Sequence, residues 1–508
     1  MSTHREPLHG SAPTVVPRWE WRTFGDVGAA DQVLATAWTA APEESDETYL
    51  LSLYGDASVK LRAGILDAKV LTRVNASGLQ LWVPTMKAAF PLLADDVTAC
   101  FLALGALPPP GRSSGVEVDE LLADLVGPRE DLRVLEVHKS RHRALLDGCM
   151  VELTELTVGG TTLPTVAVES PDPALVLETV RRIGLEGRSN TCVAKGLKSM
   201  LRWGPSRYAV LDIGTNSVKL TRGDRRPDGR PHAEADTAVV TRLGEGLAES
   251  GELTDAAMRR TADAVAALVE EARREGPTDI AAVGTAGLRQ APNRDVFVDE
   301  VFSRCGVGVE VISGPEEARL AYLAAVSTLP LTAQSLLVFD SGGGSSQFTW
   351  GSRDRIDDQF SLDVGAVRFT ERFGLDQAVT RDTVEVALAA IALDLDPLKG
   401  RPQSDTVVAI GGTATNLAAV RHGLTHYDPE VVHGTVVDLA EVDRQIESYR
   451  RRSAEERRQL AGLQPARAEV ILAGACIVRT ILTVTRQRAV IVSDHGLRHG
   501  VVAERFGR

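Results

Sequence analysis

From Tyr208 onward, apolar runs that stop at glycines alternate with longer amphipathic segments. The runs YAVLDIG, LLVFDSGGGSS and TVVAIGGTATN each predict a buried strand followed by a glycine-rich turn. A helix is expected over residues 254–275, with Thr254 as its N-cap and Gly276-Pro277 after its end. Another is expected to begin at Ser313-Gly314-Pro315. Strand, glycine turn and helix repeated in this way predict an α/β fold.

Residues 14–200 have a different pattern, in which short strand-like runs are mixed with basic and acidic residues. The stretch Gly204-Pro205-Ser206 is typical of a linker between the two regions. The predicted organisation is a disordered tail over residues 1–13, an N-terminal domain over 14–202, and two α/β subdomains over 207–330 and 331–508.

The composition is that of an ordinary soluble protein, with 508 residues, 44% hydrophobic and 25% charged. A formal net charge of −13 argues against broad binding to nucleic acid or to anionic membranes. No run of about 18 apolar residues occurs, so no membrane span is expected, and we expect a cytoplasmic protein. The five scattered cysteines predict free thiols in a reducing compartment.

Two of the glycine turns carry an aspartate, Asp212 and Asp340. A glycine-rich turn lets backbone N–H groups approach an anion closely, because no Cβ stands in the way. An Asp on each of two such turns can hold a hydrated Mg²⁺, which prefers oxygen ligands and also uses phosphate as a ligand. The similarity of the two turns predicts two related halves that face a cleft.

Several segments resemble, in order, the motifs of the exopolyphosphatase/guanosine pentaphosphate phosphatase (Ppx/GppA) family. They are DIGTNSVKL, VGTAGLRQAPN, VISGPEEARLAYLAAV, FDSGGGSSQ, VVAIGGTATNLAAV and SDHGLRHGVV, and the resemblance extends over residues 207–505. The resemblance implies a duplicated actin-like (ribonuclease H-like) ATPase fold. It also implies hydrolysis of a phosphoanhydride, with Mg²⁺ or another divalent cation as cofactor.

The resemblance implies roles for single residues. Glu317 is the expected catalytic carboxylate, which positions or activates water, and Arg289 is expected to grip phosphate. Their alternatives are an acid at a helix start and a surface arginine, and Glu316 is expected to pair with Arg319. The expected metal ligands are Asp340 and Asp212. The expected phosphate-binding residues are Gly214, Thr215, Asn216, Ser217, Gly342, Gly343, Gly344, Ser345, Gly411, Gly412 and Thr413.

Two positions depart from the family motifs. Gln347 stands where the second phosphate loop usually has a glutamate, and His499 replaces the glutamate of the closing motif. An amide carries no charge, so Gln347 is expected to weaken metal binding or slow turnover. His422 and His426 are four residues apart but have no third ligand in the sequence pattern, so no zinc site is predicted.

The N-terminal region carries cations at alternate positions of strand-like runs. They are Lys60, Arg62, Lys69, Lys139, Arg141 and Arg143. Alternate residues of a strand share a face, so these cations can line a barrel that binds a polyanion, or they can form solvated strand faces.

This region also resembles the CYTH (triphosphate tunnel) family, through RWEWR, VKLR, the K-x-R-x-R run, VELTEL and GLKSML. The resemblance implies an α+β domain built on an antiparallel β-barrel. The family begins with ExExK, whereas this chain has Arg18, Glu20 and Arg22 at those positions, so binding of a polyanion is expected here rather than metal-dependent catalysis.

The leading hypothesis is Mg²⁺-dependent release of the terminal phosphate from polyphosphate or guanosine pentaphosphate. The alternative is a polyphosphate or alarmone sensor with little turnover, and a kinase of the same fold is a third interpretation. A homodimer is expected by resemblance alone, and no nucleic-acid or membrane partner is expected.

Overall fold

The computed structural model describes residues 17–507 apart from 36, 38–40, 111–114, 227–229, 332–334 and 353–354. The predicted disordered tail therefore lies outside the described residues. The chain divides into two compact units. The first holds the chain up to Ala209, Thr215–Val218 and Val239–Val311, and the second holds Val210–Gly214, Lys219–Ala238 and Ile312–Arg508.

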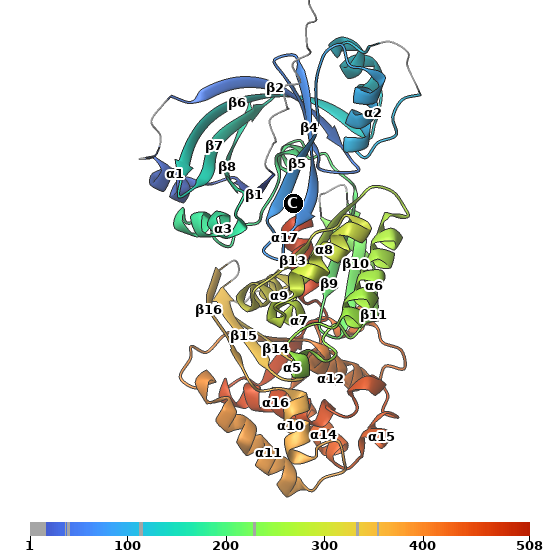
Figure 1. Ribbon diagram of the computed structural model, residues 1–508. Helices are drawn as coiled ribbons and strands as arrows, with labels where there is room; N and C mark the ends of the chain where they lie inside the picture. Colours follow the sequence, from blue (N-terminus) through green and yellow to red (C-terminus); the bar gives the residue numbers. More distant parts are fainter. Residues whose placement is uncertain are drawn as a thin grey trace, which may run out of the picture. The chain divides into compact units, whose positions relative to one another are not determined.

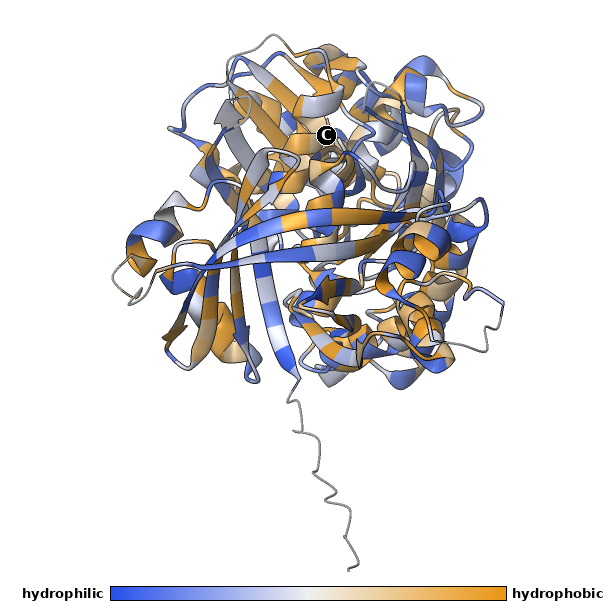
Figure 2. Ribbon diagram, turned by 90° about the horizontal axis from the view of Figure 1, so that it is seen from above, coloured by the Kyte–Doolittle hydropathy of each residue, from blue (hydrophilic) through white to orange (hydrophobic). Residues whose placement is uncertain are grey.

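Eight antiparallel strands of the first unit close into a barrel in the order β1-β5-β4-β3-β2-β6-β7-β8 (Figure 1). Hydrophilic and hydrophobic residues alternate along its long strands, so each strand presents one face to the interior (Figure 2). The predicted antiparallel barrel is thus confirmed. The strands are β1 (Arg18–Phe24), β2 (Glu43–Ser52), β3 (Ser58–Arg62), β4 (Ile65–Val74), β5 (Gln80–Ala89), β6 (Leu132–Leu146), β7 (Cys149–Val158) and β8 (Thr161–Ser170).

Helices bury apolar side chains against the barrel. Val176 and Val180 of α3 pack with Trp19 and Trp21, and Leu197 of α4 packs in a separate cluster. All five cysteines are free thiols, as predicted. The helices are α1 (Gly28–Leu34), α2 (Ala94–Ala103), the π-helix η1 (Glu120–Val126), α3 (Pro173–Arg182) and α4 (Val193–Met200).

The rest of the first unit contains the predicted helix after Thr254. This helix spans Asp255–Arg273 (α6), and the Thr254 hydroxyl caps it by accepting the N–H of Ala257 at 3.2 Å. The other elements here are α5 (Leu247–Ser250), β12 (Thr278–Gly284), α7 (Ala286–Gln290), α8 (Arg294–Cys305) and β13 (Val309–Val311).

A five-stranded sheet has the order β11-β10-β9-β12-β13, with β9 (Arg207–Ile213), β10 (Ser217–Arg225) and β11 (Pro231–Val240). The two units divide within β9, β10 and β11.

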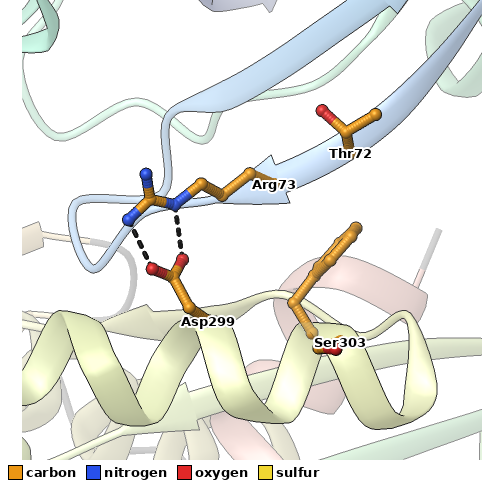
Figure 3. Close-up of a pocket in the computed structure, with 5 residues that line it drawn as sticks. Thr72, Arg73, Asp299 and Ser303 are labelled. Atoms are coloured by element: carbon orange, nitrogen blue, oxygen red, sulfur yellow. Dashed lines mark hydrogen bonds and ion pairs between the residues drawn. The ribbon is translucent and has the colours of Figure 1, made fainter.

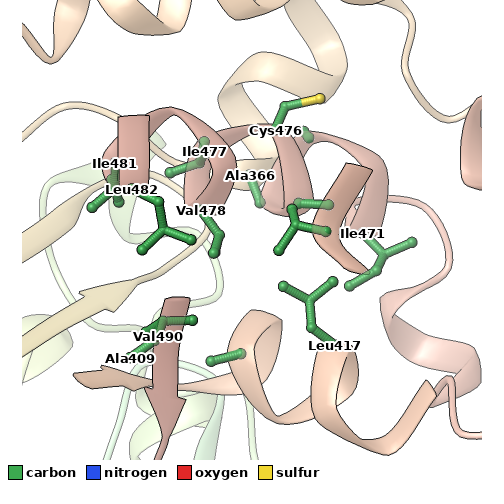
Figure 4. Close-up of a cluster of buried hydrophobic side chains, with 14 of the residues drawn as sticks. Ala366, Ala409, Leu417, Ile471, Cys476, Ile477, Val478, Ile481, Leu482 and Val490 are labelled. Atoms are coloured by element: carbon green, nitrogen blue, oxygen red, sulfur yellow. The ribbon is translucent and has the colours of Figure 1, made fainter. Parts of the chain in front are cut away.

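A six-stranded sheet of order β16-β15-β14-β17-β19-β18 forms the centre of the second unit. One face is covered by a large apolar core in which α16 packs on α10, α12, β17 and β19 (Figure 4). On the other face, Tyr322 and Ala325 of α9, and Leu329 directly after it, pack on β14 and β17. The strands are β14 (Leu336–Ser341), β15 (Ser346–Ser352), β16 (Arg355–Leu362), β17 (Thr406–Ile410), β18 (Val436–Asp438) and β19 (Ala489–Val492).

The helices of the second unit are α9 (Gly314–Thr328), α10 (Ala366–Phe373), α11 (Arg381–Asp394), η2 (Asp396–Leu398), α12 (Gly412–His422), α13 (Pro429–Val432), α14 (Leu439–Arg450), α15 (Ala454–Arg457), η3 (Pro465–Arg467), α16 (Ile471–Val484) and α17 (Leu497–Phe506). The strand, glycine-loop and helix order confirms the predicted duplicated actin-like α/β fold. Within the described ranges, no helix has the length and apolarity needed to cross a membrane.

Candidate active site

Asp340 stands at the end of β14, on the sheet face that α9 covers. Leu337 and Phe339 point into the large core, while Leu336 and Val338 contact the α9 cluster. Alternation along the strand therefore places Asp340 on the α9 side. Burial, and then the charge of Glu317, raise the pKa of Asp340 to about 6, although Lys219 and Arg467 oppose the shift. Two of the predicted site carboxylates thus lie close enough to repel each other.

Glu317 lies in the first turn of α9, as predicted. Ser313 caps this helix, its hydroxyl accepting the N–H of Glu316 at 3.2 Å, and Pro315 lies in the first turn. The Glu317 N–H donates to the carbonyl of Ser313 at 2.9 Å. Glu316 instead accepts two hydrogen bonds from Arg319, at 2.8 and 2.7 Å, as predicted. Glu316 is therefore held by Arg319, whereas Glu317 acts electrostatically on Asp340.

Asp212 is the next-to-last residue of β9 and is 8% exposed. Burial raises its pKa, and Lys219 and Arg498 oppose the rise. The Lys219 Nζ lies 3.8 Å from Asp212 Oδ2 and also acts electrostatically on Asp340. Both predicted metal-binding aspartates therefore lie near one ammonium group, to which the sequence analysis gave no role.

The second predicted phosphate loop, Gly342–Ser345, wraps around the start of α10. Its carbonyls at Gly342 and Gly343 accept the N–H groups of Ala366 and Val367, both at 2.9 Å. Within the described part of the chain, the N–H groups of Gly343 and Gly344 have no hydrogen-bond acceptor. A pocket of about 470 Å³ adjoins these two glycines. Free N–H groups on a glycine turn are what binding an oxyanion requires.

The third loop, at Gly411–Thr413, abuts Asp340. Gly411 has φ +86°, and a Cβ there would lie 2.2 Å from Asp340 Oδ1, so only glycine fits. A Cβ at Gly412 would meet the guanidinium of Arg467 at 2.4 Å. Arg467 is exposed and acts on Asp340, and the sequence analysis missed it because it lies in a short turn outside the motifs.

Of the remaining predicted phosphate ligands, Thr215, Asn216 and Ser217 belong to the first unit and Gly214 to the second. The Thr215 carbonyl accepts the N–H of Gly244 at 2.8 Å, and the Asn216 carbonyl accepts two N–H groups from residues 241 and 242. A Cβ at Gly287 would lie 3.0 Å from Thr215 Oγ1, so the start of α7 lies against this loop. Arg289 is on the same short helix. Thr215, Asn216, Ser217 and Arg289 are thus grouped in one unit, and the carboxylates in the other, with Gly214.

The two departures from the family motifs both lie near charged groups. Gln347 is the cross-strand partner of Asp340, and its amide donates to the Ser345 hydroxyl at 2.9 Å. His499 is buried and its ring stacks on His495, with centroids 3.9 Å apart. Burial, and then the neighbouring histidine, hold the pKa of His499 well below its usual value.

The barrel cations are neutralised by glutamates that the sequence analysis did not single out. Glu47 has a fully buried side chain 3.0 Å from Lys139, 3.3 Å from Lys60, and 3.6 Å from both Arg62 and Arg141. Burial opposes its ionisation, but the cations outweigh burial and lower its pKa to about 2. Glu47 is a built-in counter-ion for four of the six predicted cations.

The other predicted barrel cations also have acidic neighbours. Arg143 pairs with Glu152 at 3.1 Å and with Glu43 at 3.3 Å. Lys69 is exposed, and its charge acts on Glu169. Arg22, at the lysine position of the N-terminal motif, is buried and lies 2.8 Å from Glu20 and 3.4 Å from Glu152.

The residues fit Mg²⁺ better than a metal that needs a closed protein cage. Among the described residues, no group of three or more His, Cys, Asp or Glu side chains is arranged to hold a metal ion. Mg²⁺ usually takes one or two carboxylates and completes its shell with water and phosphate. Burial, and then the charge of Glu317, raise the pKa of Asp340, and a divalent cation bound there would favour the ionised carboxylate.

Comparisons with known proteins agree with this geometry. The model of the Ppx/GppA phosphatase family matches residues 224–508. Exopolyphosphatase 2 of Mycobacterium tuberculosis is 30% identical over 328 residues, which cover 59% of this chain and 99% of that protein. The guanosine-5'-triphosphate,3'-diphosphate pyrophosphatase of Photobacterium profundum is 28% identical over 304 residues, covering 59% of each chain. A crystal structure of the Aquifex aeolicus Ppx/GppA family member has a TM-score of 0.55 and 31% identity, and the match covers 59% of this chain and 97% of that one.

Proposed function

The chain belongs to the Ppx/GppA phosphatase family, and on this premise we propose that it is a Mg²⁺-dependent phosphohydrolase. Its substrate is a chain of phosphoanhydrides, either inorganic polyphosphate or the pentaphosphate of guanosine. Relatives named exopolyphosphatase and guanosine pyrophosphatase support both substrates. The observation that carries the proposal is the position of Asp340, which lies against Gly411 and just before the Gly342–Ser345 loop, where the charge of Glu317 also acts on it.

Transfer of a terminal phosphoryl group to water needs an oriented nucleophile and neutralisation of charge. In the proposed reaction Glu317 accepts a proton from water as the water oxygen bonds to the terminal phosphorus. The bridging anhydride oxygen leaves with the shortened chain, and inorganic phosphate is released. Asp340 and Asp212 would hold Mg²⁺, which supplies positive charge to the phosphate oxygens.

The glycine loops and the cations bind substrate in this proposal. The N–H groups of Gly343 and Gly344 donate to phosphate oxygens, and Gly411–Thr413 borders the path of the chain or of the guanosine. Lys219 and Arg467 counter the charge of the phosphates, as their effect on Asp340 suggests. Arg289 and the loop Thr215–Ser217 are grouped in the first unit, and their part in binding phosphate stays a prediction from the family resemblance.

The barrel is proposed to bind a polyanion without hydrolysing it. Its cations Lys60, Arg62, Lys139 and Arg141 surround Glu47, so an incoming phosphate has to compete with that carboxylate. Of the two ExExK glutamates that would hold a metal, one is replaced by Arg18 and only Glu20 remains. Weak, salt-dependent binding is therefore expected.

A binding or sensor role is the second candidate function. Gln347 opposite Asp340 favours it, because the amide removes a negative charge from the metal side of the sheet. In that case the chain binds polyphosphate or guanosine pentaphosphate but releases little phosphate.

The test is release of phosphate from each substrate with and without Mg²⁺. Glu317→Gln is expected to lower the rate by at least about 100-fold. Glu316→Gln is the matched control, because Glu316 is engaged by Arg319, and it should keep most of the activity. Substrate binding with no release by the wild-type chain would support the sensor and contradict the hydrolase.

A further inference from the structure

The loop between β4 and β5 of the barrel contacts the α8–β13 part of the first unit. At the end of β4, Arg73 donates two hydrogen bonds to Asp299 of α8, one of them from Nε to Oδ1 at 2.5 Å (Figure 3). The guanidinium also lies 5.7 Å from the Trp19 ring. A pocket of about 440 Å³ borders this pair. A two-point arginine–carboxylate contact fixes orientation as well as distance.

Backbone contacts extend this docking beyond the ion pair. The N–H of Val311, the last residue of β13, donates to the carbonyl of Ala76 at 3.0 Å. The N–H of Ala76 donates to Asp295 Oδ1 at 3.3 Å. Asn75 shapes the loop, because its side-chain oxygen accepts the N–H groups of Ser77 and Leu79, both at 3.0 Å. The side chain of Asn75 therefore holds the loop in shape, and the backbone of Ala76 is hydrogen-bonded to the last residue of β13.

The two parts are also in close steric contact. Gly308 precedes β13, and a Cβ there would lie 2.6 Å from a methyl of Val74. Such a distance leaves no room for a larger residue. On the barrel side, Asn190 holds the loop by donating to the Gly78 carbonyl at 2.9 Å. The loop thus joins the barrel to β13 through packing, an ion pair and backbone hydrogen bonds.

The contact with Val311 falls where the chain passes from one unit to the other. Val311 ends the first unit and Ile312 resumes the second. Ser313 follows directly and caps α9, whose first turn carries Glu317. We propose that the β4–β5 loop is a positioning device, with Arg73 and Ala76 as positioning residues that hold the end of β13 within the first unit and, through the chain that continues from Val311 to the N-cap Ser313, restrain the first turn of α9 and Glu317.

This proposal rests on the proposed role of Glu317, so its test needs a readout that does not depend on activity. Arg73→Asp places two like charges together at Asp299, and the double variant Arg73→Asp/Asp299→Arg restores the pair. Gly308→Ala disturbs the same contact by sterics alone. Arg182→Asp is the matched control, because it breaks an equally exposed pair with Asp147 elsewhere on the barrel. Thermal unfolding shows which variants remain folded.

Two measurements are made on each folded variant. The first is the kcat and KM for phosphate release, and the second is hydrogen exchange of the amides in residues 311–320. For Arg73→Asp and Gly308→Ala, kcat is expected to fall roughly 2- to 30-fold with KM nearly unchanged, which corresponds to a coupling free energy of about 0.5–2 kcal/mol. Exchange of the Glu316 and Glu317 amides is expected to rise, and the charge swap should reverse both effects.

The outcomes separate this proposal from the proposed function. If Arg73→Asp and Gly308→Ala both match Arg182→Asp in exchange at residues 311–320, the positioning role is overturned. If the wild-type chain releases no phosphate but the variants still loosen the start of α9, the hydrolase proposal fails while the loop's control of α9 stands.

Discussion

Asp340→Asn is expected to make the metal-free protein more stable while it abolishes phosphate release. Burial and the charge of Glu317 raise the pKa of Asp340 from 3.8 to about 6, so the folded protein holds an unfavourable carboxylate at neutral pH. At about 1.4 kcal/mol for each pH unit, the cost at pH 8 is up to about 3 kcal/mol. Asp340 is partly exposed, and solvent screening brings the expected gain to about 1–3 kcal/mol.

The sign of the pH dependence follows from linkage. An acid whose pKa is raised by folding costs stability above the folded pKa, and the cost disappears as pH falls towards the unfolded value. The advantage of Asp340→Asn should therefore shrink to about half at pH 5 and nearly vanish at pH 4. Added Mg²⁺ should stabilise the wild-type chain at pH 8 but not the variant, because binding to the folded state alone adds stability.

The assay is denaturant unfolding of both proteins in EDTA at pH 8 and pH 5. Asp131→Asn provides a control of opposite sign, because the hydrogen bond and charge of Arg129 lower the pKa of Asp131, and that variant should lose stability at pH 8. The reasoning is refuted if Asp340→Asn is no more stable than the wild type at pH 8, or if its advantage is the same at both pH values.

The remaining predictions concern three other sites. Gln347→Glu adds a carboxylate opposite Asp340 and should lower the Mg²⁺ concentration for half-maximal activity roughly threefold to tenfold; an unchanged or higher requirement counts against Asp340 as a metal ligand. Burial lowers the pKa of His495 to about 4, so the wild type should lose about 1–2 kcal/mol of stability between pH 7.5 and pH 5, and His495→Gln should lose less; parallel stability curves for the two proteins would contradict this. Glu47→Gln should destabilise the barrel by about 3 kcal/mol, because four cations lose their counter-ion, and added polyphosphate should restore part of that stability; a variant as stable as the wild type would show that the cations do not need Glu47.

The parts of the site that could be predicted are those where backbone geometry limits the residue type. Gly411 has a positive φ and lies against Asp340, so only glycine fits there. The glycine in the sequence therefore indicates the turn. The start of α9 was also predictable, because Ser313 and Pro315 are local signals for a helix N-terminus. Both features depend on residues close together in the chain.

Long-range pairing of charges could not be predicted in the same way. Alternation placed Lys139 and Arg141 on one face of a strand, but a period of two does not reveal which side chain lies opposite. Glu47 lies on β2, about 90 residues earlier in the chain, and it reaches Lys139 and Arg141 because β2 pairs with β6. Lys219 likewise lies within a predicted motif, and its nearness to both aspartates depends on how the second unit folds. The grouping of 239–311 with the barrel also depends on contacts between distant segments.

The central claim is that water attacks the terminal phosphorus at the site of Glu317 and Asp340. It is tested most directly by phosphate release from polyphosphate in ¹⁸O-labelled water with Mg²⁺, with the wild type and Glu317→Gln compared side by side. The account predicts one solvent oxygen in each phosphate that the wild type releases, and a rate at least about 100-fold lower in the variant. Equal rates in the two proteins, or released phosphate without solvent oxygen, would contradict it.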